Sequence, residues 1–374
     1  MNFDFSDDQK LLKEQVRKFL ADKCPTKVVR RVLDGNETHA DEVWKGLVEL
    51  GVPATTIPEA YGGLGLSPLE LCVIAEEVGR AAAPVPFDSS VVLATEALKL
   101  AGTEAQKVKW LPLLASGEAT GTVAVAEGPE PPRPRNTRTT FGGGRLNGKK
   151  VPVIDGEAAS FAIVLANTGG QGERAVSLVL VDLEQAGVSR RRVETVDPAR
   201  KHAELVFNDA AAELLGAEGE GWRTLERLYD TAAVYLAFAQ VGGAEAAMWM
   251  ARDYALQRQA FGRQIGSYQA IKHKLADCYV KLELARSNAY YGAMMLTDDG
   301  ADLPLAAAAA RIAATDAYDF AAKENIQTHG GIGFTWEADT QFHYRRSRVL
   351  ALGLGGPMAW KDKLVTRLEQ KNVT

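Results

Sequence analysis

The sequence predicts a multidomain α+β protein with an N-terminal helical domain, a small middle β domain and a C-terminal helical bundle. Its 374 residues are enough for two or three domains. Helical periodicity fills the first third, short β-branched segments follow, and long helices return near residue 229. We therefore expect domains over residues 1–120, 121–228 and 229–374.

The N-terminal domain carries clear signals for the start of a helix. Ser6 followed by Gln9 fits a capping box, and Asp7 and Asp8 are favourable at the positive end of a helix. Apolar residues then recur at helical spacing. Further helices are expected over 41–50, 68–82 and 91–115, separated by glycine and proline.

The middle domain is predicted to consist of strands. Short apolar or β-branched segments bounded by Gly, Asn or Asp lie over 122–126, 161–166, 175–181 and 202–207. Glu130–Arg135 is expected to be a loop, because proline donates no hydrogen bond to a sheet. Leu146–Gly148 is expected to be a hairpin turn.

The C-terminal domain is predicted to contain long helices over 229–258, 268–295 and 304–328. Small residues follow one stretch of the first of these helices, and we interpret them as compatible with a wide pocket. They are Ala232, Ala233, Ala237, Ala239, Gly242 and Gly243.

Composition excludes several classes of protein. Apolar residues make up 46%, charged residues 24% and the net charge is −5, which excludes a disordered chain and disfavours nucleic-acid binding. No stretch approaches the roughly 20 apolar residues of a membrane helix. Cys24, Cys72 and Cys278 are far apart, and the five histidines lack metal-ligand spacing, so we expect no metal site. With an acidic N-terminus, these features predict a cytoplasmic protein with reduced thiols.

Two motifs suggest chemistry. The first is R-Q-A-F-G-R-Q-I-G-S-Y-Q over Arg258–Gln269, and the second is Q-T-H-G-G-I-G-F-T-W-E over Gln327–Glu337. Glycines allow close approach of a ligand to the backbone, and an arginine can pair with a phosphate. Taken singly, each motif is better explained as a helix cap or a surface ion pair.

Taken together and in this order, the motifs resemble those of the acyl-CoA dehydrogenase family over essentially the full chain. The matching patterns are R-x-x-F-G-x-x-I-x-x-x-Q with a downstream L-A-D, and Q-x-x-G-G-x-G-F-x-x-E about sixty residues later. Pro58-Glu59 followed by Gly62-Gly63-Leu64-Gly65 is similar to a third family motif.

The resemblance implies a β-barrel-like middle domain, a C-terminal four-helix domain and a dimer of dimers that binds FAD non-covalently between subunits. Arg258 and Gln269 would contact the FAD of a neighbouring subunit. Its diphosphate and adenosine would lie along Gln327, Gly330 and Gly331, and its adenine beside Phe261. Tyr268 is counted with these cofactor-binding residues. The family reaction desaturates an acyl-CoA thioester and passes electrons to an electron-transfer flavoprotein.

The catalytic base is where the sequence departs from the family. The family's carboxylate stands either in a loop where this chain has Leu354, or on the helix 26 residues before Arg258, where it has Ala232. Neither side chain can take a proton, so the catalytic residue is left unassigned. The usual T-E-P-x-x-G-S-D segment beside the flavin ring is replaced by A-E-G-P-E-P-P over 126–132.

Other titratable residues are assigned structural roles. Glu245 is expected on an exposed face, Glu337 in a structural ion pair, and Asp230 faces away from the position of Ala232. His329 is expected to be a cofactor neighbour positioned by the backbone. His202 and His343 are expected at the surface, and Cys278 in the core.

Two functions remain open. One is an active FAD-dependent acyl-CoA dehydrogenase, a homotetramer with its base at an unrecognised position. The other is a non-catalytic, FAD-contacting subunit of an α2β2 heterotetramer with a base-carrying relative, acting on a steroid side chain or a dicarboxylic acyl-CoA. The retained Arg258 and Gln327 motifs beside two lost base positions favour the second mechanism. A relative with other flavin chemistry is a third, less supported class.

Overall fold

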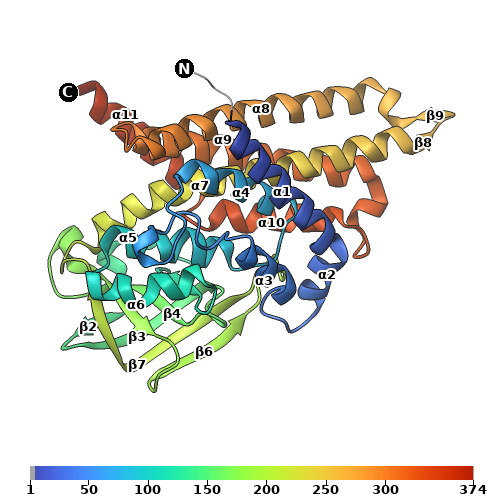
Figure 1. Ribbon diagram of the computed structural model, residues 1–374. Helices are drawn as coiled ribbons and strands as arrows, with labels where there is room; N and C mark the ends of the chain where they lie inside the picture. Colours follow the sequence, from blue (N-terminus) through green and yellow to red (C-terminus); the bar gives the residue numbers. More distant parts are fainter. Residues whose placement is uncertain (1–4, 374) are drawn as a thin grey trace. The chain divides into compact units, whose positions relative to one another are not determined.

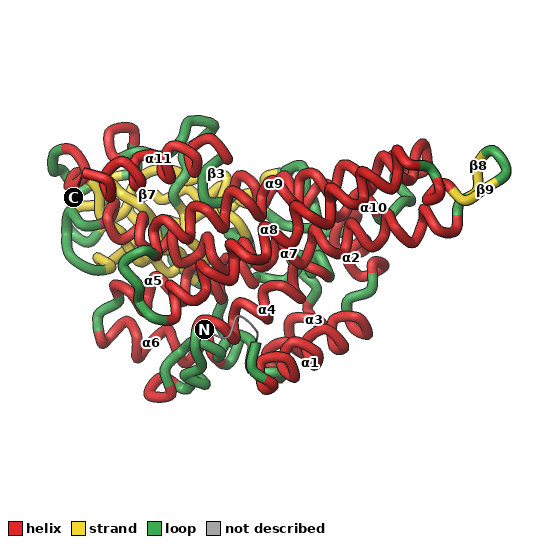
Figure 2. Tube along the Cα trace, turned by 90° about the horizontal axis from the view of Figure 1, so that it is seen from above, coloured by secondary structure: helices red, strands yellow, loops and turns green. Residues whose placement is uncertain are grey.

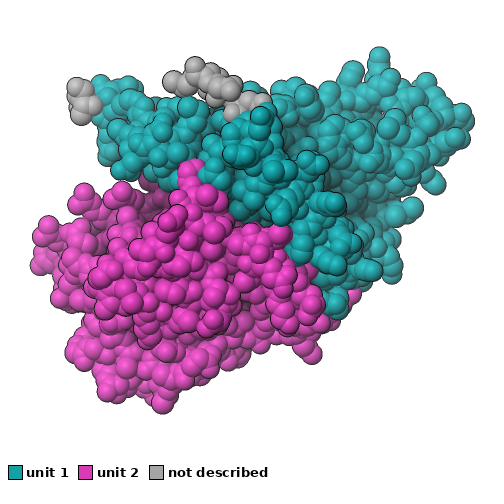
Figure 3. Space-filling model, in the orientation of Figure 1, with its two compact units in different colours: residues 1–31, 68–83, 233–374 teal, residues 32–67, 84–232 magenta. Residues whose placement is uncertain are grey.

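A computed structural model describes residues 5–373 of the chain. The backbone divides into two compact units, each assembled from segments that are far apart in the sequence (Figure 3). Within the described residues, unit 1 contains the chain up to Arg31, Pro68–Ala83 and everything from Ala233 onward. Unit 2 contains Val32–Ser67 and Pro84–Ala232. We propose a separate division of the sequence into domains, with boundaries near residues 120 and 228.

Unit 2 contains a sheet that closes on itself (Figure 1). β4 pairs with β5 and β2, β2 with β3, β3 with β7, and β7 with β5, which completes a ring. β1 adds to β4 and β6 to β7. The strands are β1 (Gly121–Ala124), β2 (Thr140–Gly142), β3 (Arg145–Ile154), β4 (Phe161–Asn167), β5 (Val176–Asp182), β6 (Val188–Val193) and β7 (His202–Leu215).

The sequence of the strands explains the closed sheet. β4 and β5 are apolar along nearly their whole length and are buried, whereas β6 alternates between exposed and half-buried residues. The ring is filled by small and branched side chains such as Val164, Val179 and Leu205. The expected barrel-like middle region is therefore confirmed.

One predicted turn in this region is wrong. Leu146–Gly148 lies inside β3, where the register shifts between Leu146 and Gly148 as in a β-bulge. The turn between β2 and β3 is formed by Gly143 and Gly144, which both have positive φ. Glycine adopts this conformation without a steric penalty, so a Gly-Gly pair serves as the turn.

Most helices of unit 2 precede the strands. They are α3 (Asp41–Glu49), η1 (Glu59–Tyr61), η2 (Phe87–Ala94), α5 (Thr95–Ala101) and α6 (Glu104–Ala115), and α2 (Thr26–Asp34) and α7 (Gly221–Gln257) each contribute one end. The single helix expected over 91–115 is interrupted at Gly102. Thr103 then caps α6 in a capping box with Gln106.

Unit 1 is helical apart from one small hairpin (Figure 2). It contains α1 (Asp7–Lys23), α4 (Pro68–Arg80), most of α7, α8 (Gln269–Thr297), α9 (Leu303–His329), α10 (Thr340–Leu352) and α11 (Pro357–Val373). The predicted capping box of Ser6 and Gln9 is present at the start of α1. The predicted order of helices, strands and helices is confirmed.

The small residues of α7 allow close packing, so their interpretation as the wall of a wide pocket is wrong. A Cβ atom at Gly242 would lie 1.8 Å from the carbonyl oxygen of Glu76 on α4, and one at Gly243 would meet the ring of Tyr318 on α9. A Cβ atom at Gly79 of α4 would likewise lie 1.9 Å from the carbonyl oxygen of Ala239. These glycines let helix backbones approach each other.

Two further observations concern the whole described chain. In residues 5–373, no helix combines the length and the apolar character that a bilayer span requires. Cys24, Cys72 and Cys278 are all unbridged and buried, so the expectation for Cys278 is confirmed.

Candidate functional site

The first predicted motif forms a hairpin at one end of unit 1. α7 ends at Gln257, and Arg258 directly follows it with its N–H donating to the carbonyl of Tyr254. β8 (Gln259–Ala260) then pairs with β9 (Arg263–Gln264). Phe261 and Gly262 form the tip, both with positive φ, and the hairpin projects beyond the helices in Figure 1. The Phe261 side chain is 96% exposed.

Tyr268 fixes the conformation of this hairpin. Its hydroxyl donates to the carbonyl oxygen of Ala260 at 3.0 Å, and the guanidinium of Arg263 lies over its ring at 4.0 Å. The carbonyl of Arg258 accepts a hydrogen bond from the N–H of Ile265. Gln269 begins α8 directly afterwards and is exposed. Tyr268 is thus half-buried within the motif, whereas Arg258, Phe261 and Gln269 face outward.

The second motif forms the end of α9 and the turn after it. Gln327 is exposed on the last helical turn, and η6 (Gly330–Phe334) follows. Gly330 has φ +62 and ψ −141, a conformation essentially restricted to glycine. A Cβ atom on Gly330 or Gly331 would meet no atom within 4 Å, so both backbones face open space.

A stacked aromatic pair holds the two motifs at the same end of unit 1. The rings of Tyr254 on α7 and His329 on α9 lie 4.1 Å apart, centroid to centroid. His329 Nδ1 lies 2.8 Å from the carbonyl oxygen of Asn325, which sets the ring's orientation. We name the exposed residues Arg258, Gln269, Gln327, Gly330 and Gly331 of these two motifs the glycine cradle. The sequence motifs do not include Tyr254, although it stands one helical turn before Arg258.

The glycine cradle has the chemistry of a site for phosphate groups. Within residues 5–373, the exposed guanidinium of Arg258 pairs with no carboxylate. Open glycine backbone lets a phosphate approach main-chain N–H groups, and a guanidinium binds phosphate with two parallel hydrogen bonds. The residues present therefore fit the diphosphate part of a dinucleotide such as FAD.

Residues 126–132 of unit 2 stand where the family's flavin-ring motif would be. They fit a flavin ring less well than the glycine cradle fits a diphosphate. The carboxylate of Glu127 accepts hydrogen bonds from the backbone N–H groups of Arg138 and Thr139, and from the buried ammonium of Lys150 at 2.7 Å. Burial lowers the pKa of Lys150 to about 8, although Glu127 opposes this shift. Pro129 and Pro132 line a hollow of about 180 Å³ beside them and carry no N–H to offer a ring.

Both positions expected for a base hold buried apolar side chains. Leu354, in unit 1, is 3% exposed, and its carbonyl accepts the indole N–H of Trp360. Ala232, in unit 2, is fully buried. Asp230, also in unit 2, is a buried carboxylate on α7. In residues 5–373, no group of three or more His, Cys, Asp or Glu side chains is placed to hold a metal ion.

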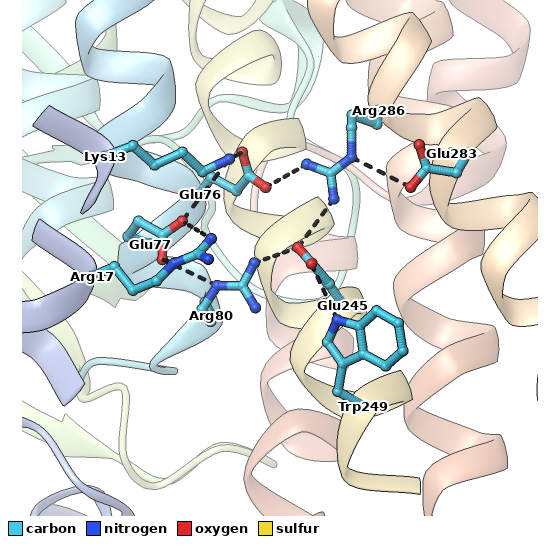
Figure 4. A network of polar contacts seen from close by, with 9 residues as sticks. All are labelled: Lys13, Arg17, Glu76, Glu77, Arg80, Glu245, Trp249, Glu283 and Arg286. Atoms are coloured by element: carbon cyan, nitrogen blue, oxygen red, sulfur yellow. Dashed lines mark hydrogen bonds and ion pairs between the residues drawn. The ribbon is translucent and has the colours of Figure 1, made fainter. Parts of the chain in front are cut away.

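The expected exposure of Glu245 is wrong, because it belongs to an ion network between four helices (Figure 4). Arg80 of α4 and Arg286 of α8 both donate to its carboxylate, and Trp249 donates its indole N–H at 3.1 Å. Burial raises the pKa of Glu245, but the two guanidinium groups outweigh it and lower the pKa to about 2. A carboxylate so stabilised is a poor general base.

Three other assignments are corrected or refined. His202 and His343, expected at the surface, are buried at 8% and 6% exposure. Burial lowers the pKa of His202, and the hydroxyl of Tyr318 lies 3.0 Å from His343 Nδ1. Near Glu337, the ion pair joins Arg30 to Asp339. Glu337 accepts a hydrogen bond from the same guanidinium through its backbone carbonyl.

Comparison with known proteins finds two family models that match this chain, and the second matched range contains both motifs. Residues 6–118 match the family model of the acyl-CoA dehydrogenase N-terminal domain, and residues 209–357 match that of the C-terminal domain. A Mycobacterium tuberculosis protein named acyl-CoA dehydrogenase IpdE2 is 31% identical, covering 98% of this chain and 97% of its own.

Two solved structures have the same fold. The ChsE4-ChsE5 complex from Mycobacterium tuberculosis has TM-score 0.89 and 25% identity, covering 99% of both chains. A variant of a steroid ACAD described as Tcur3481-Tcur3483 has TM-score 0.88 and 28% identity, covering 98% of this chain and 99% of its own. With its two motifs, its closed sheet and these matches, the chain belongs to the acyl-CoA dehydrogenase family of flavin-dependent oxidoreductases, which act on a CH–CH bond of acyl-CoA thioesters.

Proposed function

We propose that this chain is the FAD-contacting subunit of a heteromeric acyl-CoA dehydrogenase, in which a base-carrying relative supplies the catalytic carboxylate. One contrast carries the proposal. The glycine cradle is open and its Arg258 has no carboxylate partner in the described chain, whereas Leu354 and Ala232 occupy the base positions as buried apolar residues.

In this proposal the cradle holds the FAD of the neighbouring subunit. Arg258 pairs with the diphosphate, and Gly330 and Gly331 let the chain's backbone approach it. Gln269 and Gln327 donate amide hydrogen bonds, while Phe261 packs against the adenine; Tyr268 contributes by fixing the hairpin. Bound there, FAD supplies the acceptor for the hydride that leaves the β carbon of the acyl group.

The α proton must then go to a carboxylate outside this chain's two usual positions. The methyl group of Ala232 and the isobutyl group of Leu354 accept no proton. The carboxylate of Glu245 already pairs with two guanidinium groups. The carboxylate of Glu127 is already bound to Lys150, and the prolines beside it offer no N–H group. Both features support weak binding of a flavin ring by this chain's own middle domain. In this proposal the relative therefore supplies the base that takes the α proton, and this chain helps to hold the FAD that accepts the hydride.

The nature of the assembly and of the substrate is part of the same proposal. A similar structure is a complex of two differently named chains, ChsE4 and ChsE5, and another is described as a steroid ACAD. We therefore place this chain in an α2β2 heterotetramer that acts on a steroid side-chain thioester, with an electron-transfer flavoprotein as electron acceptor. A dicarboxylic acyl-CoA is the second substrate to test.

The test is an anaerobic titration with a panel of acyl-CoAs, following the flavin absorbance band. The purified chain is compared with the same chain co-expressed with a relative that retains the glutamate and is encoded beside it. We expect little FAD and no bleaching for the chain alone, and full bleaching for the complex. Arg258→Gln in this chain should lower the FAD content of the complex, whereas Arg252→Gln, paired with the adjacent Asp253, should not.

Bleaching by the chain alone would contradict the proposal. It would establish the second candidate, a catalytically complete homotetramer. Asp230 is then the residue to test first, because it is a buried carboxylate on α7. In that case Asp230→Asn should abolish bleaching without lowering FAD content.

A further inference from the structure

A cavity of about 270 Å³, partly open to solvent, is lined by residues of α1, α2, α4, α7 and α10 in unit 1. It shares no residue with the glycine cradle, and nothing in the proposed function uses it. Most of its walls are apolar, including Leu20, Val29, Met250 and Phe342. Ala246 and Met250 are one turn apart on α7 and only half-buried, although Ala244 and Ala247 beside them are fully buried. Both line this cavity.

One wall of the cavity is charged. Arg17, Glu77 and Arg80 line it, and Glu77 lies between the two guanidinium groups. Arg17 Nε and Nη2 donate to the Glu77 carboxylate at 2.9 and 2.8 Å, and Arg80 Nε donates to it at 3.0 Å. Arg80 Nη2 donates to Glu245 (Figure 4). In the described chain, Nη1 of each arginine has no hydrogen-bond acceptor.

A third positive charge acts on the same space. The guanidinium of the buried Arg346 donates to the carbonyl oxygens of Ala82 and Ala83 at 3.1 and 3.3 Å, and Ala82 lines the cavity. Cys24 also lines it. Burial raises the pKa of this thiol to about 12, although Arg346 opposes the shift, so Cys24 contributes a neutral wall. The lining therefore favours an anion over a cation.

We propose that this cavity binds an amphipathic carboxylate, with its alkyl chain against Leu20, Met250 and Phe342 and its carboxylate against Nη1 of Arg17 and Arg80. An apolar cavity of about 150 Å³ is enough to bind benzene. This one is larger and accommodates a ligand of about ten non-hydrogen atoms. A carboxylate satisfies guanidinium N–H groups that are otherwise left to water, and the alkyl chain gains from leaving water.

The test uses octanoate and the full chain labelled with ¹³C at its methionine methyl groups. We expect octanoate to shift the Met250 methyl signal, assigned by Met250→Leu, with saturation at one site per chain. 1-Octanol should bind at least threefold more weakly than octanoate. Arg17→Gln, whose side chain is 46% exposed, should weaken octanoate at least threefold and leave octanol unchanged.

A cavity-filling variant supplies the second arm. Ala246→Leu should weaken octanoate binding at least tenfold, and the matched Ala301→Leu, at an exposed alanine outside the cavity, should not. A shift confined to other methionines, or octanoate binding unchanged in folded Ala246→Leu, would overturn the site. Equal affinity for octanoate and octanol would overturn the role of the arginines. Should Ala246→Leu fail to fold, Arg17→Gln still decides.

Discussion

The ring of Tyr254 stacks on the imidazole of His329 with their centroids 4.1 Å apart and their planes 27° apart. Tyr254 stands four residues before Arg258, and His329 directly precedes Gly330. Together with the hydrogen bond from the Asn325 amide to Met250 Sδ, this contact joins the end of α7 to the end of α9, where the two motifs meet. Stacked aromatic pairs contribute about 0.5–1.5 kcal/mol beyond their burial, which is enough to influence how well the glycine cradle is preorganised.

Replacing Tyr254 should loosen the cradle without removing any group that contacts a phosphate. We expect Tyr254→Ala to weaken FAD binding to the assembled enzyme about three- to tenfold, the equivalent of the stacking energy. Tyr254→Phe keeps the stack and should bind FAD normally. Titration of the apo complex with FAD, followed by flavin fluorescence, measures both. Equal loss in the two variants would show that the hydroxyl, and not the stack, matters.

Adjacent glycines of the cradle should respond differently to the same substitution. A Cβ atom on Gly331 meets nothing within 4 Å in the chain, so Gly331→Ala should leave the Tm unchanged but obstruct the approach of a diphosphate. Gly330 has φ +62, and Gly330→Ala should cost about 1–3 kcal/mol of stability as well. Thermal unfolding and FAD titration of each variant separate the two effects. Normal FAD binding by Gly331→Ala would contradict the placement of the phosphates.

The stability of unit 1 should depend on Glu245 in acid. Burial raises its pKa, but Arg80 and Arg286 lower it to about 2, well below the ordinary 4.5. The unfolded chain then binds this proton more readily, so the stabilisation is complete above pH 4.5 and is lost as pH falls toward 2. A difference of this size corresponds to about 3 kcal/mol.

Urea unfolding at several pH values between about 3 and 7 measures this dependence. Glu245→Gln should be less stable than the wild type at neutral pH, and the difference should shrink as the pH falls. Glu42→Gln, whose native carboxylate is 83% exposed, is the matched control and should follow the wild-type curve. Parallel curves for Glu245→Gln and the wild type would rule out the assigned ionisation.

The elements with strong local signals could be predicted from the sequence. Glycine, asparagine and aspartate bound the strands β4 and β5, and the capping box of Ser6 and Gln9 specifies the start of α1. Both motifs of the glycine cradle were likewise recognisable as spacing patterns. Their meeting at one end of unit 1 was not, because it involves contacts between residues that are far apart in the sequence, such as the stack of Tyr254 on His329, 75 positions later.

The errors share one physical cause, which is that tertiary contacts decide what a local pattern means. Glu245 looked like a surface residue, but Arg286 of another helix pairs with it. Gly242 looked like the wall of a pocket, but α4 packs directly on it. His343, polar by type, is buried against Tyr318. In each case the deciding partner is distant in sequence, so the local pattern could not indicate it.

The buried pair of Glu127 and Lys150 should show strong energetic coupling. The Lys150 side chain is fully buried and its ammonium meets the Glu127 carboxylate at 2.7 Å and the carbonyl oxygen of Val125 at 3.1 Å. Removing one partner of a buried ion pair typically costs about 3–5 kcal/mol, because the other charge loses its compensation. Glu127→Gln should reach that range, and Lys150→Met should cost less, since Glu127 keeps two backbone N–H donors and is partly exposed.

The double variant Glu127→Gln/Lys150→Met should recover most of the loss, and urea unfolding of all four proteins at neutral pH gives the coupling energy. Lys149→Met is the control, because the neighbouring lysine is 53% exposed and its ion pair with Glu204 should contribute less than about 1 kcal/mol. The pKa of Lys150, lowered by burial to about 8, adds a second signature. The unfolded chain holds this proton up to its ordinary pKa of 10.5, so the wild type should gain stability between pH 8 and 10.5 relative to Lys150→Met. An additive double variant would contradict the coupling of Glu127 and Lys150, and the absence of the gain between pH 8 and 10.5 would show that burial does not lower the pKa of Lys150 in the folded chain.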